Sequence, residues 1–154
     1  MPYLVDGNNV MAQRVGWHRD KAGARRRLIQ DLARFLAARK VKVTVVFDGS
    51  PDTDFPEGSR YKSVRILYAR AGSDADSRVK ELVRRSTNKR DLILVSSDRE
   101  LAAAAAGQGA RVVPSGKFRK MLNEAIAEGL EKPAQTDQID IDEWLDYFER
   151  SETN

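Results

Sequence analysis

Five short runs rich in valine, isoleucine and leucine alternate with segments in which apolar residues recur at helical spacing. The runs cover residues 3–5, 41–47, 63–69, 91–96 and 110–113. Helices are expected between and after them, over about residues 21–36, 74–86, 98–106 and 115–128, the first with Asp20 as its N-cap. Strands and helices that alternate in this way form a mainly parallel sheet with helices on both faces. The sequence therefore predicts a three-layer α/β fold with about five strands.

Two segments interrupt this alternation. Residues 49–62 contain two prolines and two glycines, and we expect them to form a long loop. Residues 131–154 are predicted to be a polar linker and a short acidic amphipathic helix. The apolar face of that helix consists of Ile141, Trp144, Leu145 and Phe148. We therefore expect one domain over residues 1–130 and a C-terminal helix that docks on it, joins a partner chain, or covers its basic surface.

The charges of the chain are unevenly distributed. There are 27 Lys and Arg against 23 Asp and Glu, which gives a net charge of +4. Residues 131–154 hold eight acidic and two basic residues, so residues 1–130 carry a net charge of +10. A basic domain favours a polyanionic partner, because each neutralised phosphate releases counterions. A generic solubilising surface explains the charge about equally well.

Composition excludes several classes of protein. The chain has no cysteine, so it has no thiol nucleophile, disulfide or zinc–thiolate site. No run approaches the roughly 20 apolar residues that span a bilayer, and the first residues do not resemble a signal peptide. We expect a cytoplasmic protein that has no membrane partner.

Aspartates stand at the ends of the predicted strands. Asp6 follows the first strand, Asp48 the second and Asp98 the fourth, while Asp74 and Asp76 begin the helix after the third. In a parallel sheet these positions share the carboxyl edge, where open α/β sheets bind their ligands. We therefore expect the carboxylates to converge.

Each aspartate also has a local explanation. Turn formation competes for Asp6 and Asp48, and helix capping competes for Asp74 more than for the other acids. The spacings of Ser73 with Asp76 and of Ser97 with Glu100 resemble capping boxes. Turn formation alone does not explain a cluster, because two carboxylates ~5 Å apart repel by roughly 3 kcal/mol at an effective dielectric constant of ~20. A divalent cation relieves this repulsion, and oxygen ligands suit Mg²⁺ or Mn²⁺.

Other catalytic chemistries fit the residues less well. His18 is the single histidine and lies far from any strand end, which excludes a Ser-His-Asp triad and a histidine zinc site. No GxxxxGK[ST] phosphate loop is present. Asn8 occupies the place where a phosphatase of the haloacid dehalogenase type needs a second aspartate. Metal-assisted attack of water on a phosphodiester is the chemistry that remains.

Four motifs occur in an order that is typical of a known family. They are YLVDGNN at 3–9, VVFDG at 45–49, DADSRV at 74–79 and VSSDREL at 95–101. These motifs resemble the YacP-like branch of the NYN domains, which are PIN-like nucleases, and EWLDYF in the tail resembles the end of short members. The resemblance implies a PIN-like, Rossmann-like fold and a Mg²⁺- or Mn²⁺-dependent endoribonuclease that acts in RNA processing or decay.

The same resemblance implies roles for individual residues. It places Asp6, Asp76 and Asp98 at the metal site, with Asp48 as a fourth acid and weaker support for Asp74. Asn9 could orient Asp6, contact phosphate or shape a turn, and Ser97 could contact the substrate or cap a helix. Basic candidates for gripping RNA at the carboxyl edge are Arg60, Lys62, Arg70, Arg78, Lys117, Arg119 and Lys120.

Other basic and aromatic residues are less closely tied to the site. We expect a solvated face to include Arg25, Arg26, Arg27, Arg84, Arg85, Lys89 and Arg90. Phe55 and Tyr61 could stack on bases or pack the long loop against the domain.

Two rival functions remain open. One is an RNA- or ribosome-binding adaptor without turnover, which the complete set of aspartates disfavours, because negative charge weakens phosphate binding. The other is a small-molecule phosphoesterase, which the basic domain and Asn8 disfavour. RNA held by a ribosome is compatible with binding that depends mainly on phosphate contacts. A homodimer is also compatible with the sequence.

Overall fold

The structure, a computed structural model, describes residues 2–131. The predicted linker and acidic helix, with their apolar face, lie outside the described residues. The strands are β1 (Pro2–Asp6), β2 (Lys42–Phe47), β3 (Arg60–Tyr61), β4 (Val64–Tyr68), β5 (Ile93–Val95) and β6 (Arg111–Val113). The helices are α1 (Gly7–Met11), η1 (Trp17–Arg19, a 3₁₀ turn), α2 (Lys21–Arg39), α3 (Ala75–Arg85), α4 (Arg99–Gly107) and α5 (Ser115–Glu131).

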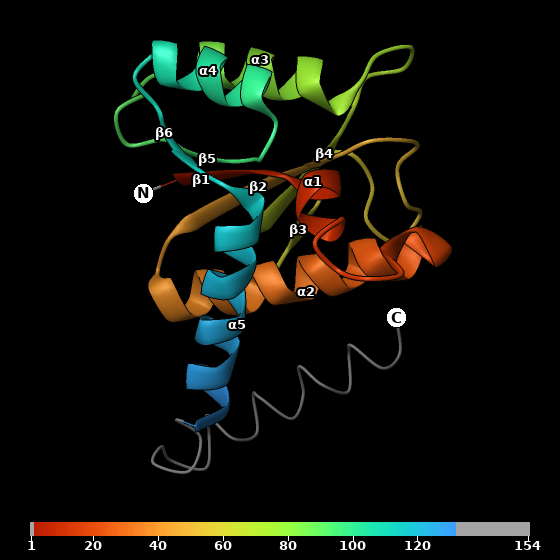
Figure 1. Ribbon diagram of the computed structural model, residues 1–154. Coiled ribbons are helices and arrows are strands. Elements are labelled where there is room, and N and C mark those ends of the chain that lie inside the picture. Colours follow the sequence, from red (N-terminus) through yellow and green to blue (C-terminus); the bar gives the residue numbers. More distant parts are fainter. Residues whose placement is uncertain (1, 132–154) are drawn as a thin grey trace.

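The strands form one sheet between two helical layers. Their order is β3-β4-β2-β1-β5-β6, and every pair is parallel except β3 with β4. Helices α2 and α5 cover one face, and α3 and α4 cover the other (Figure 1). This arrangement confirms the predicted three-layer α/β fold.

Both faces of the central strands are buried, which explains why the strand sequences are continuously apolar. Leu4, Val46 and Leu94 pack in the core beneath α3 and α4. Their neighbours in the chain face the opposite core, beneath α2 and α5, because successive strand side chains point to opposite faces. The two cores together fix the strand register.

The strand order also determines where a ligand site is expected on the sheet. β1 is central, with β2 on one side and β5 on the other. The chain runs outward from β1 through β2 to β4, and then crosses to β5 on the opposite side. Such a reversal of direction opens a crevice at the carboxyl ends of the strands. Asp6, the last residue of β1, therefore lies where this fold class binds ligands.

Strand β3 was not predicted from the sequence. It forms a hairpin with β4 across Lys62 and Ser63, which both have positive φ, 46° and 75°. This turn conformation usually selects asparagine or glycine. The predicted loop over residues 49–62 consequently ends in a short edge strand.

Helix α1 was also not predicted from the sequence, in which Asp6-Gly7-Asn8 has the composition of a turn. The backbone instead enters a helix at Gly7, with Asp6 as the N-cap residue. A Cβ atom on Gly7 would lie 2.5 Å from the Phe47 ring and 2.9 Å from the Val46 carbonyl oxygen. Gly7 thus lets α1 approach β2 closely.

The longer helices begin within one residue of the predicted positions, but the N-cap residues of α3 and α4 differ from the expected ones. The Asp20 side chain caps α2 by accepting from the Gly23 amide at 2.9 Å. The N-caps of α3 and α4 are Asp74 and Asp98, so the capping boxes expected at Ser73 and Ser97 are wrong. Each of these two helices begins one residue later than its capping-box spacing predicts.

None of the helices in the described part of the chain is both long enough and apolar enough to cross a bilayer.

Candidate active site

Asp6 is the most deeply buried carboxylate of the site. Its side chain closes β1, its residue is only 5% exposed, and its Oδ2 accepts a hydrogen bond from the Ser96 hydroxyl at 2.9 Å. The pKa of Asp6 is raised to about 6, chiefly by burial and also by the negative charges of Asp76 and Asp48, while the Ser96 hydrogen bond lowers it. Asp6 is therefore a buried carboxylate that lies close enough to other carboxylates to be repelled by them.

Asp76 lies in the first turn of α3 and is half-buried. Its pKa is raised by burial and by the charges of Asp98, Asp74 and Asp48. Its carboxylate makes no hydrogen bond or ion pair with any residue from 2 to 131. We refer to Asp6, Asp48, Asp74, Asp76 and Asp98 as the acidic cluster.

Asp48 holds the start of α3 against the end of β2. Its Oδ1 accepts from the Ala75 amide at 2.7 Å, and its own amide donates to Asn8 Oδ1 at 3.0 Å. Since Ala75 precedes Asp76, this hydrogen bond positions the Asp76 side chain beside the sheet edge. Asp48 thus acts structurally as well as electrostatically.

Asp98 is tied to Asp6 through Ser96. The Asp98 amide donates to Ser96 Oγ at 3.1 Å, while that hydroxyl donates to Asp6. Asp98 Oδ1 accepts from the amides of Glu100 and Leu101 at 2.9 and 3.0 Å, which caps α4. Its Oδ2 accepts no hydrogen bond within the described residues.

Asp74, like Asp48, is solvent-exposed. Its Oδ1 accepts from the Ser77 amide at 2.8 Å, and this interaction lowers the pKa of Asp74. Asp74 therefore caps α3, as the local explanation of this aspartate predicted.

Asn9 and Ser97 connect three elements behind the acids. Asn9 Oδ1 accepts from the Ser97 amide at 2.8 Å and also from the Ser115 hydroxyl. Ser97 Oγ accepts from the Ser115 amide at 2.9 Å, at the start of α5. Ser115, fully buried, was missed by the sequence analysis. Its position directly after Pro114, at the end of β6, is the signal that could have indicated it.

The predicted basic residues are distributed over several surfaces. Arg70 pairs with Glu81 at 2.8 Å, and Arg78 pairs with Glu57 at 3.4 Å. Arg119 is paired with Asp31 of α2 at 2.8 Å, with both side chains largely buried. The other four, Arg60, Lys62, Lys117 and Lys120, are exposed. The acids are thus brought together more closely than the bases.

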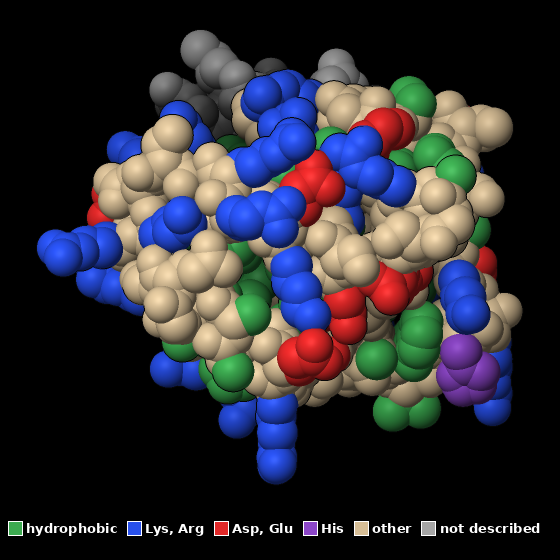
Figure 2. Space-filling model, turned by 90° about the horizontal axis from the view of Figure 1, so that it is seen from above, with side chains coloured by type: hydrophobic (Ala, Val, Ile, Leu, Met, Phe, Trp, Pro, Cys, Tyr) green, Lys and Arg blue, Asp and Glu red, His purple; other side chains and the backbone are tan. Residues whose placement is uncertain are grey.

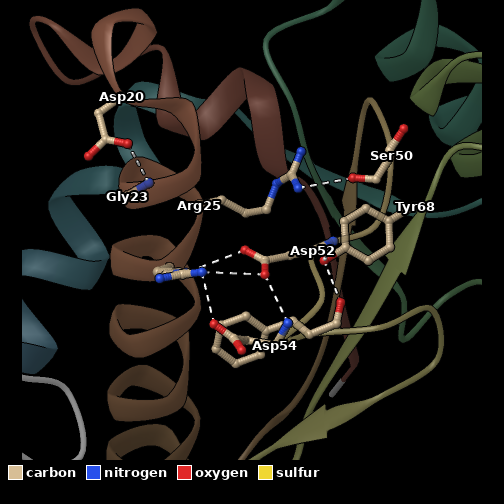
Figure 3. A network of polar contacts seen from close by, with 9 residues as sticks. Asp20, Gly23, Arg25, Ser50, Asp52, Asp54 and Tyr68 are labelled. Atoms are coloured by element: carbon tan, nitrogen blue, oxygen red, sulfur yellow. Dashed lines mark hydrogen bonds and ion pairs between the residues drawn. The ribbon is translucent and has the colours of Figure 1, made fainter. Parts of the chain in front are cut away.

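Arg25 and Arg26 do not lie on a solvated face, and this prediction was wrong. Arg25 donates to the carbonyl oxygens of Asp48 and Ser50 at 2.9 and 3.2 Å, with its guanidinium 5.2 Å from the Tyr68 ring. Arg26 pairs with two aspartates of the long loop, Asp52 and Asp54 (Figure 3). Both arginines fasten that loop to α2.

The aromatic residues of the loop also hold it in place. Phe55 is buried and contacts the Tyr61 ring edge to face, with centroids 5.8 Å apart. The Tyr68 hydroxyl donates to the Phe55 carbonyl oxygen at 2.6 Å. Of the two roles considered for Phe55, packing is therefore the one observed.

The acidic cluster suits a hard cation in its donor chemistry. All its side-chain donors are oxygens, and burial together with mutual repulsion raises the pKa values of Asp6 and Asp76. Within residues 2–131, however, no three metal-ligating side chains already form a metal-holding group. The cluster thus has the ligands and the uncompensated charge of a cation site without a preformed ligand triad.

Comparisons with known proteins agree with this architecture. The sequence model for the YacP-like NYN domain matches residues 3–152. A crystal structure of Rae1 (YacP) from Bacillus subtilis superposes with a TM-score of 0.68 at 22% identity, covering 100% of this chain and 95% of that one. A structure of a mutant of the same protein gives a TM-score of 0.70 at 21% identity, covering 90% and 85%. No curated protein sequence matches significantly.

Proposed function

This chain belongs to the YacP-like NYN domain family, within the PIN-like nucleases, and we propose that it is a metal-dependent endoribonuclease. Its substrate would be RNA, its reaction the hydrolysis of a phosphodiester bond, and its cofactor Mg²⁺ or Mn²⁺. The observation that carries the proposal is the burial of the Asp6 carboxylate at the carboxyl edge of the sheet, near Asp76 and Asp48, whose charges together with burial raise its pKa to about 6. Two acids from other elements, Asp48 after β2 and Asp76 in the first turn of α3, thus act electrostatically on one carboxylate.

The proposed cation would be held by Asp6, Asp76 and Asp98. When bound, it would supply an activated water and neutralise charge that develops on the phosphate. Ser96 orients Asp6 by donating to its Oδ2, and Asp48 positions Asp76 by accepting from the Ala75 amide. Asp74 would add negative charge at the rim while it caps α3.

The test is RNA cleavage by the purified protein with and without Mg²⁺ or Mn²⁺. Asp6→Asn and Asp98→Asn should abolish cleavage, and asparagine preserves the cap of α4. Asp91→Asn, an exposed substitution away from the cluster, serves as the matched control and should keep full activity. Cleavage that is independent of metal, or that survives both cluster substitutions, would refute the proposal.

A second candidate is an RNA- or ribosome-binding adaptor without turnover. The observation that favours it is the absence, in the part of the chain that is described, of a preformed group of three metal ligands. Isothermal titration with Mn²⁺ separates the two functions. Saturable binding that requires Asp6 and Asp98 supports the nuclease, whereas RNA binding without any metal binding supports the adaptor.

The partner and location belong to the same proposal. RNA, free or presented by a ribosome, would be gripped through phosphates, and the cytoplasm is the proposed location. Lys and Arg side chains occur together with acidic ones across the face that contains α3 and α4 (Figure 2). Sedimentation of the purified chain would establish whether it forms the homodimer that its sequence allows.

A further inference from the structure

A cleft of about 660 Å³ lies beside the acidic cluster. Its walls are residues 49–51 on one side and residues 69–73 on the other, with Glu57, Tyr68 and Arg78 completing the lining. Sites for small ligands commonly have volumes of about 300–1,000 Å³. The cleft is thus large enough for one nucleotide.

The cleft and the acidic cluster share their boundary. Gly49 directly follows Asp48, and Ser73 directly precedes Asp74. The hydrogen bond from the Ala75 amide to Asp48 Oδ1, 2.7 Å long, joins these two chain segments. A strand whose phosphate lies at the acidic cluster therefore has its neighbouring nucleotide at the cleft.

The lining combines small residues with two fixed guanidinium groups. Arg70 makes two hydrogen bonds to Glu81, of 2.8 and 3.4 Å, yet its side chain remains 57% exposed. Two-point pairing fixes the plane of a guanidinium group, and RNA-binding proteins stack unpaired bases on such planes. The cleft therefore has a preset stacking surface at its rim.

Arg78 supplies a second guanidinium group to the lining of the cleft. It donates to the Tyr68 carbonyl oxygen at 3.1 Å and pairs with Glu57 at 3.4 Å. Its buried Nε has no hydrogen-bond partner in the described part of the chain, which leaves a donor unsatisfied. Both guanidinium groups are already ion-paired, Arg70 with Glu81 and Arg78 with Glu57, so the cleft offers a stacking plane and fixed donors rather than net positive charge.

We propose that this cleft binds one unpaired nucleotide of the RNA next to the scissile phosphate, with its base stacked on Arg70. A base in a duplex is covered by its partner and its neighbours, so it cannot enter a concave site. The Glu57 carboxylate is already occupied by Arg78 and by the Tyr68 amide, so it contributes little to base-specific hydrogen bonding, and stacking itself accepts every base. The cleft therefore selects single-stranded RNA at that position with little preference among bases. This inference rests on the proposed function.

The test measures RNA affinity without turnover. The Asp98→Asn protein is mixed, in Mg²⁺, with an end-labelled short single-stranded RNA or with its duplex, and fluorescence anisotropy reports binding. Arg70→Ala removes the stacking plane, and Ala71→Trp fills the cleft from an exposed position. The matched controls are Arg84→Ala and Ala103→Trp, which make the same changes at exposed positions on α3 and α4.

Arg70→Ala should weaken binding of the single strand by about tenfold, the loss expected for one stacked base. Ala71→Trp should weaken it at least as much, and duplex RNA should bind weakly to every variant. The cleft proposal would be overturned if the cleft variants and the control variants bound the single strand with equal affinity. It would also be overturned if the protein with an unaltered cleft bound the duplex as tightly as the single strand. An inactive wild-type protein with cleft-dependent binding would refute the proposed nuclease activity and leave the cleft as a nucleotide site.

Discussion

The Ser96 hydroxyl donates to Asp6 Oδ2 at 2.9 Å and accepts from the Asp98 amide at 3.1 Å, so one buried side chain links β1 to the start of α4. Ser96 is 1% exposed, which makes water a poor substitute for either partner. This hydroxyl, together with the hydrogen bond from the Ser97 amide to Asn9, sets the relative placement of two proposed metal ligands.

Ser96→Ala should therefore destabilise the protein and disturb the site together. The partly buried Asp98 amide would lose its acceptor, at a cost of about 1–3 kcal/mol in the free energy of unfolding. The pKa of Asp6 should rise further, because the Ser96 hydrogen bond lowers it. Urea denaturation and NMR titration measure the two effects, with the exposed Ser50→Ala as control. An unchanged Asp6 pKa would contradict this account.

The pKa of Asp6 predicts how stability depends on pH in the absence of metal. The folded protein keeps the proton up to about pH 6, whereas the unfolded chain releases it near 3.8. The unfolded state thus binds fewer protons between these values, so the free energy of unfolding contributed by Asp6 falls as pH rises through this window. The contribution is complete below pH 3.8 and lost above about pH 6.

Asp6→Asn should remove that dependence. Above pH 6 the variant should be more stable than the wild type by about 2–3 kcal/mol, and near pH 3.8 the difference should vanish. Thermal unfolding at several pH values in EDTA measures this. Asp91→Asn should follow the wild-type curve. A variant that is less stable than the wild type at pH 8 would show that the Asp6 carboxylate stabilises the fold.

Metal binding should stabilise the folded protein through the same carboxylates. A cation that binds only the folded state adds about 2.7 kcal/mol to the free energy of unfolding at a concentration 100 times its dissociation constant. Mn²⁺ should therefore raise the melting temperature of the wild type, more at pH 8 than at pH 5, because protons compete for Asp6. Asp98→Asn should show little shift, and an equal shift in both proteins would place the ion elsewhere.

The convergence of the aspartates was predictable because it depends on topology. Residues that directly follow parallel strands must share one edge of the sheet, so the positions of Asp6, Asp48 and Asp98 in the sequence were sufficient. The order of strands, with β1 at the centre, then determined that Asp6 would be the most buried acid.

The parts that could not be predicted depend on long-range side-chain contacts. Arg25 lies on a helix surface by its periodicity, but its guanidinium reaches the carbonyl oxygen of Asp48, which is 23 residues away. Ser115 and Asn9 are 106 residues apart and meet only when α1 and α5 both pack on the sheet. The Arg25 contact leaves no local sequence pattern, and the Ser115 contact leaves only the position of Ser115 directly after Pro114.

Gly7 should be intolerant of even a methyl group, because a Cβ atom there would lie 2.5 Å from the Phe47 ring and 2.9 Å from the Val46 carbonyl oxygen. Gly7→Ala should cost about 1–3 kcal/mol of folding free energy through overpacking, and it should displace α1 with its Asn9 contacts. Gly107→Ala is the matched control, since nothing lies within 4 Å of its Cβ position, and it should be neutral or slightly stabilising. Urea denaturation compares the two variants, and amide exchange at Ser97, which donates to Asn9, reports whether α1 has moved. Equal stability of both variants would mean that β2 can yield to α1 at this contact.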